Sequence, residues 1–156
     1  MNRTRVGLGY DLHRLVLGKP LIIGGVKMES EWGALAHSDG DTLVHAMIDS
    51  LLSPLGFGDI GLIYPDHDQK WKGVSSLDLL KDIRDRFLKN TVIINMDSVV
   101  ILDKPKISSL IPQMKKNIAE VLRITEDRIN IKGKTSENTR VYSIEAHTVT
   151  LLELEG

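Results

Sequence analysis

Three side chains in the first third of the sequence have the chemistry of a metal site. Asp11 and His13 lie two residues apart in VGLGYDLHR, a segment that alternates like a β-strand. Alternation places both on one face of the strand, above Gly7 and Gly9, where no side chain fills the space. The opposite face of this strand carries the apolar side chains Val6, Leu8, Tyr10 and Leu12.

A helix supplies the third candidate ligand. The segment HSDGDTLVHAMIDSLL has an acidic start followed by apolar residues, and Asp41, His45 and Asp49 are spaced four apart along one polar stripe. Asp and His ligands suit zinc, and three protein ligands leave a fourth position for water or substrate. The alternative is that Asp11 braces a turn and both histidines are ordinary imidazoles.

Composition limits the class of protein. The 156 residues are 42% hydrophobic and 26% charged, as expected for one globular domain spanning 1–156. A net charge of −1 without a basic run argues against nucleic-acid or membrane partners. Without cysteine, zinc must be held by His and carboxylate. The amino terminus lacks an apolar signal core, so we expect a cytoplasmic protein, or a plastid protein whose transit peptide has been removed.

Hydrophobic periodicity predicts the elements that position these residues. Ser75 with Asp78 resembles a capping box, and Pro112 suits the opening turn of a helix. We expect a long, functional loop over 56–73. The expected helices cover 41–53, 75–90 and 107–122. The expected strands are the first segment, a short pair around Gly24 and Gly25, 91–102, 128–134 and 142–154. This order predicts an α/β (α+β) sandwich in the manner of ferredoxin-like folds, a mixed sheet with helices on one face.

Other catalytic motifs are absent. The GLG of residues 7–9 lacks the third glycine and the helix start of a dinucleotide site, and neither a P-loop nor a GxSxG motif occurs. Polar clusters remain at DIG, YPDHD and KGKTSEN. In the last of these, Glu137 has the chemistry to bind a harder ion such as magnesium, unless it is a solvated loop glutamate.

The motifs together resemble a known family. GYDLH, IIGG, AHSDGDTLVHA, GDIG with YPDHD, DKPK with IPQM, and KTSE occur in this order over residues 5–137. The chain is thereby similar to the 2-C-methyl-D-erythritol 2,4-cyclodiphosphate synthase family. The resemblance implies a phosphorus–oxygen lyase of non-mevalonate isoprenoid synthesis. It would convert 4-diphosphocytidyl-2-C-methyl-D-erythritol 2-phosphate to the cyclodiphosphate, releasing CMP, as a homotrimer with sites between subunits.

The resemblance also implies roles for single residues. Asp11, His13 and His45 match the family's zinc ligands. Glu137 matches the ligand of magnesium, or manganese in its place. His37 and Thr135 are implied to donate hydrogen bonds to the charge that develops on phosphate, and are the predicted catalytic residues. The other predicted substrate contacts are Asp11, His13, Ser38, Asp59, Ile60, Gly61, Tyr64, Asp66, Asp68, Lys104, Pro105, Lys106, Lys134 and Glu137.

The chain departs from the family after Glu137. The segment NTRVYSIEAH is several residues shorter than the family's LGFTGRGEGI stretch, so either the loop is pruned, with Arg140 as a substitute contact, or residues are missing. His67 has no assigned role, and His147 is expected to be structural. Two other functions stay open: a zinc phosphoesterase that activates water, and a non-enzymatic trimeric module that binds metal or an isoprenoid.

Overall fold

The computed structural model describes residues 3–155 and contains a five-stranded mixed sheet. The strand order is β4-β1-β7-β5-β6, and only β5 and β6 run parallel. A separate hairpin is formed by β2 and β3 around Gly24 and Gly25, as predicted. The strands are β1 Arg3–Leu17, β2 Leu21–Ile23, β3 Val26–Met28, β4 Trp32–Ala34, β5 Thr91–Ile101, β6 Ile129–Lys134 and β7 Ser143–Leu154.

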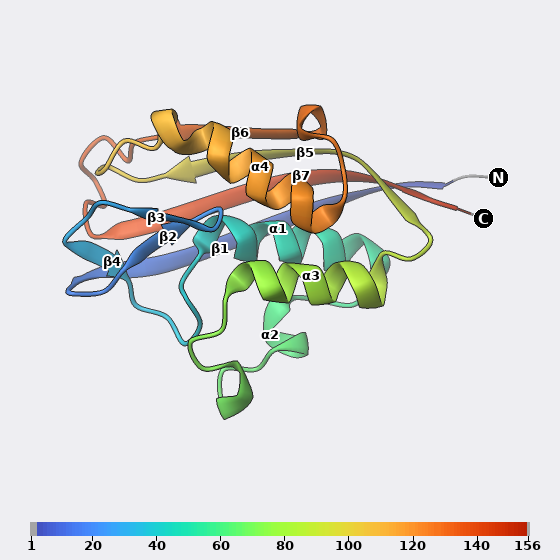
Figure 1. Ribbon diagram of the computed structural model, residues 1–156, viewed down its shortest axis with the longest axis horizontal. Helices are drawn as coiled ribbons and strands as arrows, with labels where there is room; N and C mark the ends of the chain where they lie inside the picture. Colours follow the sequence, from blue (N-terminus) through green and yellow to red (C-terminus); the bar gives the residue numbers. More distant parts are fainter. Residues whose placement is uncertain (1–2, 156) are drawn as a thin grey trace.

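Three longer helices cover one face of the sheet (Figure 1). Helix α1 lies on β1 and β7, α4 packs beside β6, and α3 lies alongside both helices. The mixed sheet with helices on one face is confirmed, and β6 and β7 follow each other without a helix, as the predicted order has them. The closer likeness to ferredoxin-like folds stays a prediction. The helices are α1 Thr42–Leu52, α2 Ile60–Ile63, α3 Ser76–Phe87 and α4 Ile111–Leu122, with short 3-10 turns at Ser53–Leu55, Gln69–Trp71, Ser108–Leu110 and Glu126–Arg128.

Helix α1 touches strand β1 through the main chain. A Cβ added at Gly9 would lie 1.7 Å from the carbonyl oxygen of Ala46, and one at Gly7 would lie 1.8 Å from that of Ser50. No side chain larger than hydrogen fits at either position without moving the helix. The two glycines therefore let the helix that carries His45 rest directly on the strand that carries Asp11 and His13.

Asp41 begins α1 and joins it to the β2–β3 hairpin. One carboxylate oxygen accepts the Val44 amide at 3.1 Å and the Gly24 amide at 2.9 Å, while the other accepts the Gly25 amide at 2.7 Å. Burial raises the pKa of this carboxyl to about 6, against the lowering effect of the three amides. Asp41 precedes α1 as its N-cap, and its buried carboxylate is bound to main-chain amides, so it does not join His45 at the metal position.

The second face of the sheet is not covered by any element of residues 3–155. Its side chains alternate with buried ones along β1 and β7, and Leu8 is 64% exposed. The predicted alternation along β1 is thus confirmed. The large hydrophobic side chains exposed on this face include Val6, Leu8, Tyr10, Leu12 and Val149.

The sequence patterns missed several short elements. The segment before the first helix contains β4, and the loop predicted over 56–73 contains α2 and a 3-10 turn at Gln69–Trp71. Ser75 precedes α3 but makes no capping bond with its side chain, so the predicted capping box is wrong. Asp39 instead accepts the amide of Ser76 at 2.9 Å. Among residues 3–155, no helix is both long and apolar enough to cross a membrane.

Candidate active site

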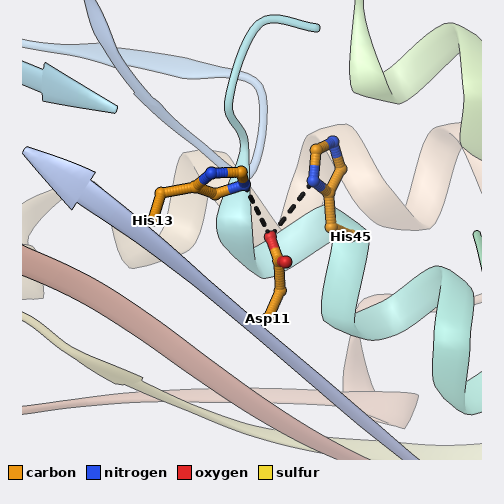
Figure 2. Close-up of side chains that lie close together, drawn as sticks. All are labelled: Asp11, His13 and His45. Atoms are coloured by element: carbon orange, nitrogen blue, oxygen red, sulfur yellow. Dashed lines mark hydrogen bonds and ion pairs between the residues drawn. The ribbon is translucent and has the colours of Figure 1, made fainter. Parts of the chain in front are cut away.

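Asp11, His13 and His45 converge on one point (Figure 2). Asp11 Oδ2 lies 2.9 Å from His13 Nε2 and 3.1 Å from His45 Nδ1. The ligand atoms of the three side chains all lie within 4.8 Å of one another. The structure therefore brings together, from β1 and α1, the three residues that the sequence selected.

The hydrogen bonds of His13 show that this point suits a cation. His13 Nδ1 lies 3.2 Å from the carbonyl oxygen of Leu35, which can only accept, so Nδ1 carries the proton and Nε2 has a lone pair when the ring is neutral. Nε2 is buried and makes no hydrogen bond with residues 3–155, although it approaches the Asp11 carboxylate closely. A lone pair facing a carboxylate is repulsive unless a cation lies between them. A divalent metal meets this need, and the Asp/His₂ donor set fits zinc.

The pKa values of Asp11 and His13 show that their charges depend on each other. Burial alone would raise the pKa of Asp11, but the close approach of the His13 and His45 rings outweighs burial and holds that pKa well below its usual range. Burial likewise opposes charge on His13, but the Asp11 carboxylate outweighs it and raises the pKa of His13. Without metal, a proton shared with Asp11 takes the place of the cation.

Removing the metal is expected to reverse part of the pH dependence of stability. Folding raises the pKa of His13, so protonated His13 adds to the free energy of unfolding. This contribution is complete below the pKa of histidine in the unfolded chain, about 6.5, and is lost as the pH rises above that pKa. A divalent metal bound here would compete with the proton, so the stabilisation by metal would grow over the same pH range. Urea unfolding between about pH 6 and about pH 8.5, with chelator or with zinc, should show slopes of opposite sign. Equal slopes would argue against a shared proton and metal position.

The cluster opens into a hollow of about 450 Å³. Its lining contains both polar groups and apolar side chains, as in many small-molecule sites. The predicted residues that line it together with the three candidate ligands are His37, Ser38, Ile60, Gly61, Tyr64 and Asp66. Besides the candidate ligands, six of the predicted substrate contacts thus lie around this hollow.

Several of these residues are held by the protein itself. His37 Nε2 donates to the carbonyl oxygen of Asp68 at 3.3 Å, and the Tyr64 hydroxyl donates to Asp82. Burial, then the Asp82 bond, raises the pKa of Tyr64, so this hydroxyl stays protonated and only its ring is left to line the hollow. Asp59 accepts the Leu62 amide at 3.1 Å and begins α2.

The remaining predicted contacts lie elsewhere on the chain. A second hollow, of about 330 Å³, lies where β5 and β6 end and is lined by Pro105, Lys106, Lys134, Thr135 and Glu137. Lys104 faces a third hollow. Glu137 accepts a bond from Thr135 at 3.0 Å and is exposed. Within residues 3–155 the only cluster of three side chains that could hold a metal is Asp11, His13 and His45, so Glu137 does not belong to such a cluster.

The shortened segment after Glu137 turns toward the open sheet face. Arg140 Nη1 lies 2.7 Å from Glu145 Oε2, and His147 Nε2 lies 3.1 Å from Glu145 Oε1. The His147 ring also packs against Tyr10, with 4.8 Å between ring centroids. Arg140 is therefore paired with Glu145 in this structure, and His147 contacts residues of the sheet rather than the metal cluster.

Three residues outside the predicted site support it: Ser76, Asp39 and Asp49. Ser76 Oγ lies 2.8 Å from His45 Nε2, and its hydroxyl donates to Asp39. Asp49 accepts the amide of Ile60 at 2.8 Å and so fixes the start of α2 against α1. The four-residue spacing from His45 pointed to Asp49, but nothing in the sequence joins Ser76 to a histidine 31 positions away.

A mixed sheet with an open Asp/His₂ cluster beside a hollow of mixed lining defines an α/β domain with a candidate metal site. The model of the YgbB family matches residues 4–153. The chain belongs to the YgbB family.

The relatives of known name are similar over most of the chain. A Clostridium botulinum (strain Alaska E43 / Type E3) protein named 2-C-methyl-D-erythritol 2,4-cyclodiphosphate synthase is 51% identical over 134 residues, 85% of each chain. One of the same name from Caldicellulosiruptor bescii is 46% identical over 153 residues, 95% of this chain and 98% of that one. A solved structure titled "IspF (Plasmodium falciparum) CDP complex" has a TM-score of 0.85 and 37% identity, covering 100% of this chain and 99% of that one.

Proposed function

We propose that the chain is a single catalytic domain that forms 2-C-methyl-D-erythritol 2,4-cyclodiphosphate from 4-diphosphocytidyl-2-C-methyl-D-erythritol 2-phosphate. The observation that carries this function is the three-ligand cluster of Asp11, His13 and His45, which opens into a hollow lined by several of the predicted substrate contacts. The names of the relatives agree with it, and the CDP complex of the Plasmodium falciparum protein fits a cytidyl substrate. We also propose a cytoplasmic location.

The reaction requires no protein nucleophile. An oxygen of the substrate's 2-phosphate forms a bond to the β-phosphorus, the bond from that phosphorus to the bridging oxygen breaks, and CMP leaves with the electron pair. The protein must hold two anionic groups close together and stabilise the charge on the transferring phosphoryl group. This demand for positive charge and hydrogen-bond donors matches a site built from a metal cluster and polar loops.

The chain's own residues would hold the two ends of the substrate. In this proposal His37 and Ser38 contact the phosphate beside the metal, and Asp59, Ile60 and Gly61 hold the erythritol. Lys104, Pro105 and Lys106 would contact the cytosine, with Lys134 nearby. Thr135 would donate a hydrogen bond to the diphosphate. The position of Pro105, Lys106, Lys134 and Thr135 around one hollow supports a common ligand for them.

Two metal positions are proposed. Asp11, His13 and His45 would hold zinc, and Glu137 would hold magnesium or manganese against the diphosphate. Bound metals would neutralise phosphate oxygens and act as Lewis acids. The buried, unbonded Nε2 of His13 supports the first position. The exposed carboxylate of Glu137, in the hollow proposed for the nucleotide, supports the second.

The two halves of the site must meet for one substrate to bind. In one chain they form separate hollows, so we propose a homotrimer in which the metal side of one subunit faces the nucleotide side of the next. The open sheet face supports this assembly, since contiguous exposed apolar side chains usually mark an interface.

The product of the reaction tests the function. With zinc, magnesium and the diphosphocytidyl substrate, phosphorus NMR should show the cyclic diphosphate and CMP in equal amounts. A hydrolysed monoester would instead indicate a zinc phosphoesterase. If no product forms and the zinc has four protein ligands without an exchangeable position, the chain is a structural or binding module.

Replacing Glu137 with glutamine is expected to weaken the magnesium dependence without removing zinc. The substitution keeps the shape of the side chain but removes the charge, and Glu137 lies in a different hollow from the zinc ligands. The magnesium concentration for half-maximal rate should rise about 10-fold, the effect of about 1.4 kcal/mol. Zinc content, measured by atomic absorption, should stay at the wild-type level. Equal loss of both metals would contradict the separate assignment.

A further inference from the structure

One ring nitrogen of His45 points away from the metal cluster. While Nδ1 faces Asp11, Nε2 lies 2.8 Å from the Oγ of Ser76 and 3.1 Å from that of Ser38. His45 is only 7% exposed and Ser76 is completely buried, so water has little access to this side of the ring. The groups that contact Nε2 therefore decide where the ring proton lies.

The hydroxyl of Ser76 is already committed. It donates its proton to Asp39 Oδ1, and an ionised carboxylate can only accept. Ser76 Oγ is then left with lone pairs toward His45, so Nε2 must carry the proton of a neutral ring. Nδ1 consequently presents its lone pair to the point shared with Asp11 and His13. Ser38 does not fix this choice, because its hydroxyl is not bound to a carboxylate.

Asp39 is itself held in place by the main chain. Its Oδ1 accepts the amide of Asp41 at 3.0 Å, and its Oδ2 accepts the amide of Ser76 at 2.9 Å. Asp39 lies just before α1 and Ser76 is the first residue of α3. The carboxylate, the hydroxyl and the imidazole thus form a continuous chain across the junction of two helices.

We propose that Ser76, supported by Asp39, is a positioning residue that fixes the ring orientation and tautomer of His45 for zinc. The proposal rests on the zinc position of the proposed function. Partners of this kind make an imidazole a stronger ligand, and their loss typically lowers metal affinity by about 10- to 100-fold. Ser76 touches neither the metal position nor the substrate hollow, so its effect acts through His45.

The test is the zinc dissociation constant of the full chain, measured by competition with a chromophoric chelator. Ser76→Ala should weaken zinc binding about 10- to 100-fold. The matched control is Ser75→Ala, since the neighbouring serine makes no capping bond, and its affinity should stay within about 2-fold of wild type. Asp39→Asn, which keeps an acceptor but removes the charge, should fall between wild type and Ser76→Ala. It also serves as the second variant if Ser76→Ala fails to fold in a thermal unfolding test.

A spectroscopic readout separates this role from a structural one. In the zinc-loaded protein, a proton–nitrogen correlation of the His45 ring should show a proton on Nε2 that exchanges slowly with water, and faster exchange in Ser76→Ala. A proton on Nδ1, or unchanged affinity and exchange in Ser76→Ala, would overturn the proposal while leaving the zinc position intact. If the wild-type chain binds no zinc, the proposed function and this proposal both fail.

Discussion

Replacing His45 with alanine is expected to remove the bound zinc and to lower turnover by about 10³-fold or more, while the sheet stays folded. The loss is large because a metal acting as a Lewis acid supplies several kcal/mol of charge stabilisation. The fold should survive because the neighbours of His45 on α1, from Leu43 to Ile48, are buried and hold the helix on the sheet without it. Zinc content by atomic absorption and turnover by phosphorus NMR measure the two effects.

The matched control for His45→Ala is His67→Ala, an exposed histidine outside the metal cluster. It should keep the wild-type zinc content. Circular dichroism of His45→Ala should retain the wild-type spectrum, with a loss of unfolding free energy of about 1–3 kcal/mol. Global unfolding of His45→Ala would mean that the imidazole serves the core rather than a metal.

Replacing Leu8 with glutamate is expected to dissociate the proposed trimer and to lower activity by about 100-fold or more at micromolar chain concentration. Leu8 lies on the uncovered sheet face and is 64% exposed in the single chain. Burying an unpaired carboxylate in an apolar interface costs several kcal/mol, and a trimer would contain three copies. Sedimentation velocity should give the mass of one chain, and the two hollows would then lack their partner halves.

The matched control for Leu8→Glu lies on the same strand. Leu17 is 63% exposed, but its odd position places it on the opposite side of β1 from Leu8. Leu17→Glu should therefore remain a trimer with wild-type activity. A Leu8→Glu protein that stays trimeric and active would show that this sheet face is not the interface.

The three candidate ligands could be selected from the sequence because their spacing follows local periodicity. Alternation along β1 places Asp11 and His13 on one face, and helical spacing places His45 on α1. That the strand and the helix bring all three together depends on their packing, which spacing alone does not establish. The glycines at positions 7 and 9 were read only as leaving space beside the ligands, and the structure shows that helix α1 fills it. The predicted helices and long strands are confirmed for the same reason, since each pattern extends over several repeats.

The supporting contacts were not predictable because they join distant parts of the chain. Ser76 meets His45 only because α3 begins where α1 begins, a relation that depends on packing between helices. The buried position of Asp41 depends in the same way on the β2–β3 hairpin. Short elements such as β4 and α2 are held by neighbouring segments rather than by their own periodicity, so their sequences resemble loops.

The contact between α1 and β1 limits which substitutions the protein can accept during evolution. Where Gly7 and Gly9 meet the carbonyl groups of Ser50 and Ala46, the spacing of the two elements is limited by main-chain atoms. The separation of Asp11 from His45 therefore depends little on which apolar side chains fill the rest of the interior. Most core residues can therefore be substituted without changing the separation of the metal ligands, whereas Gly7 and Gly9 cannot.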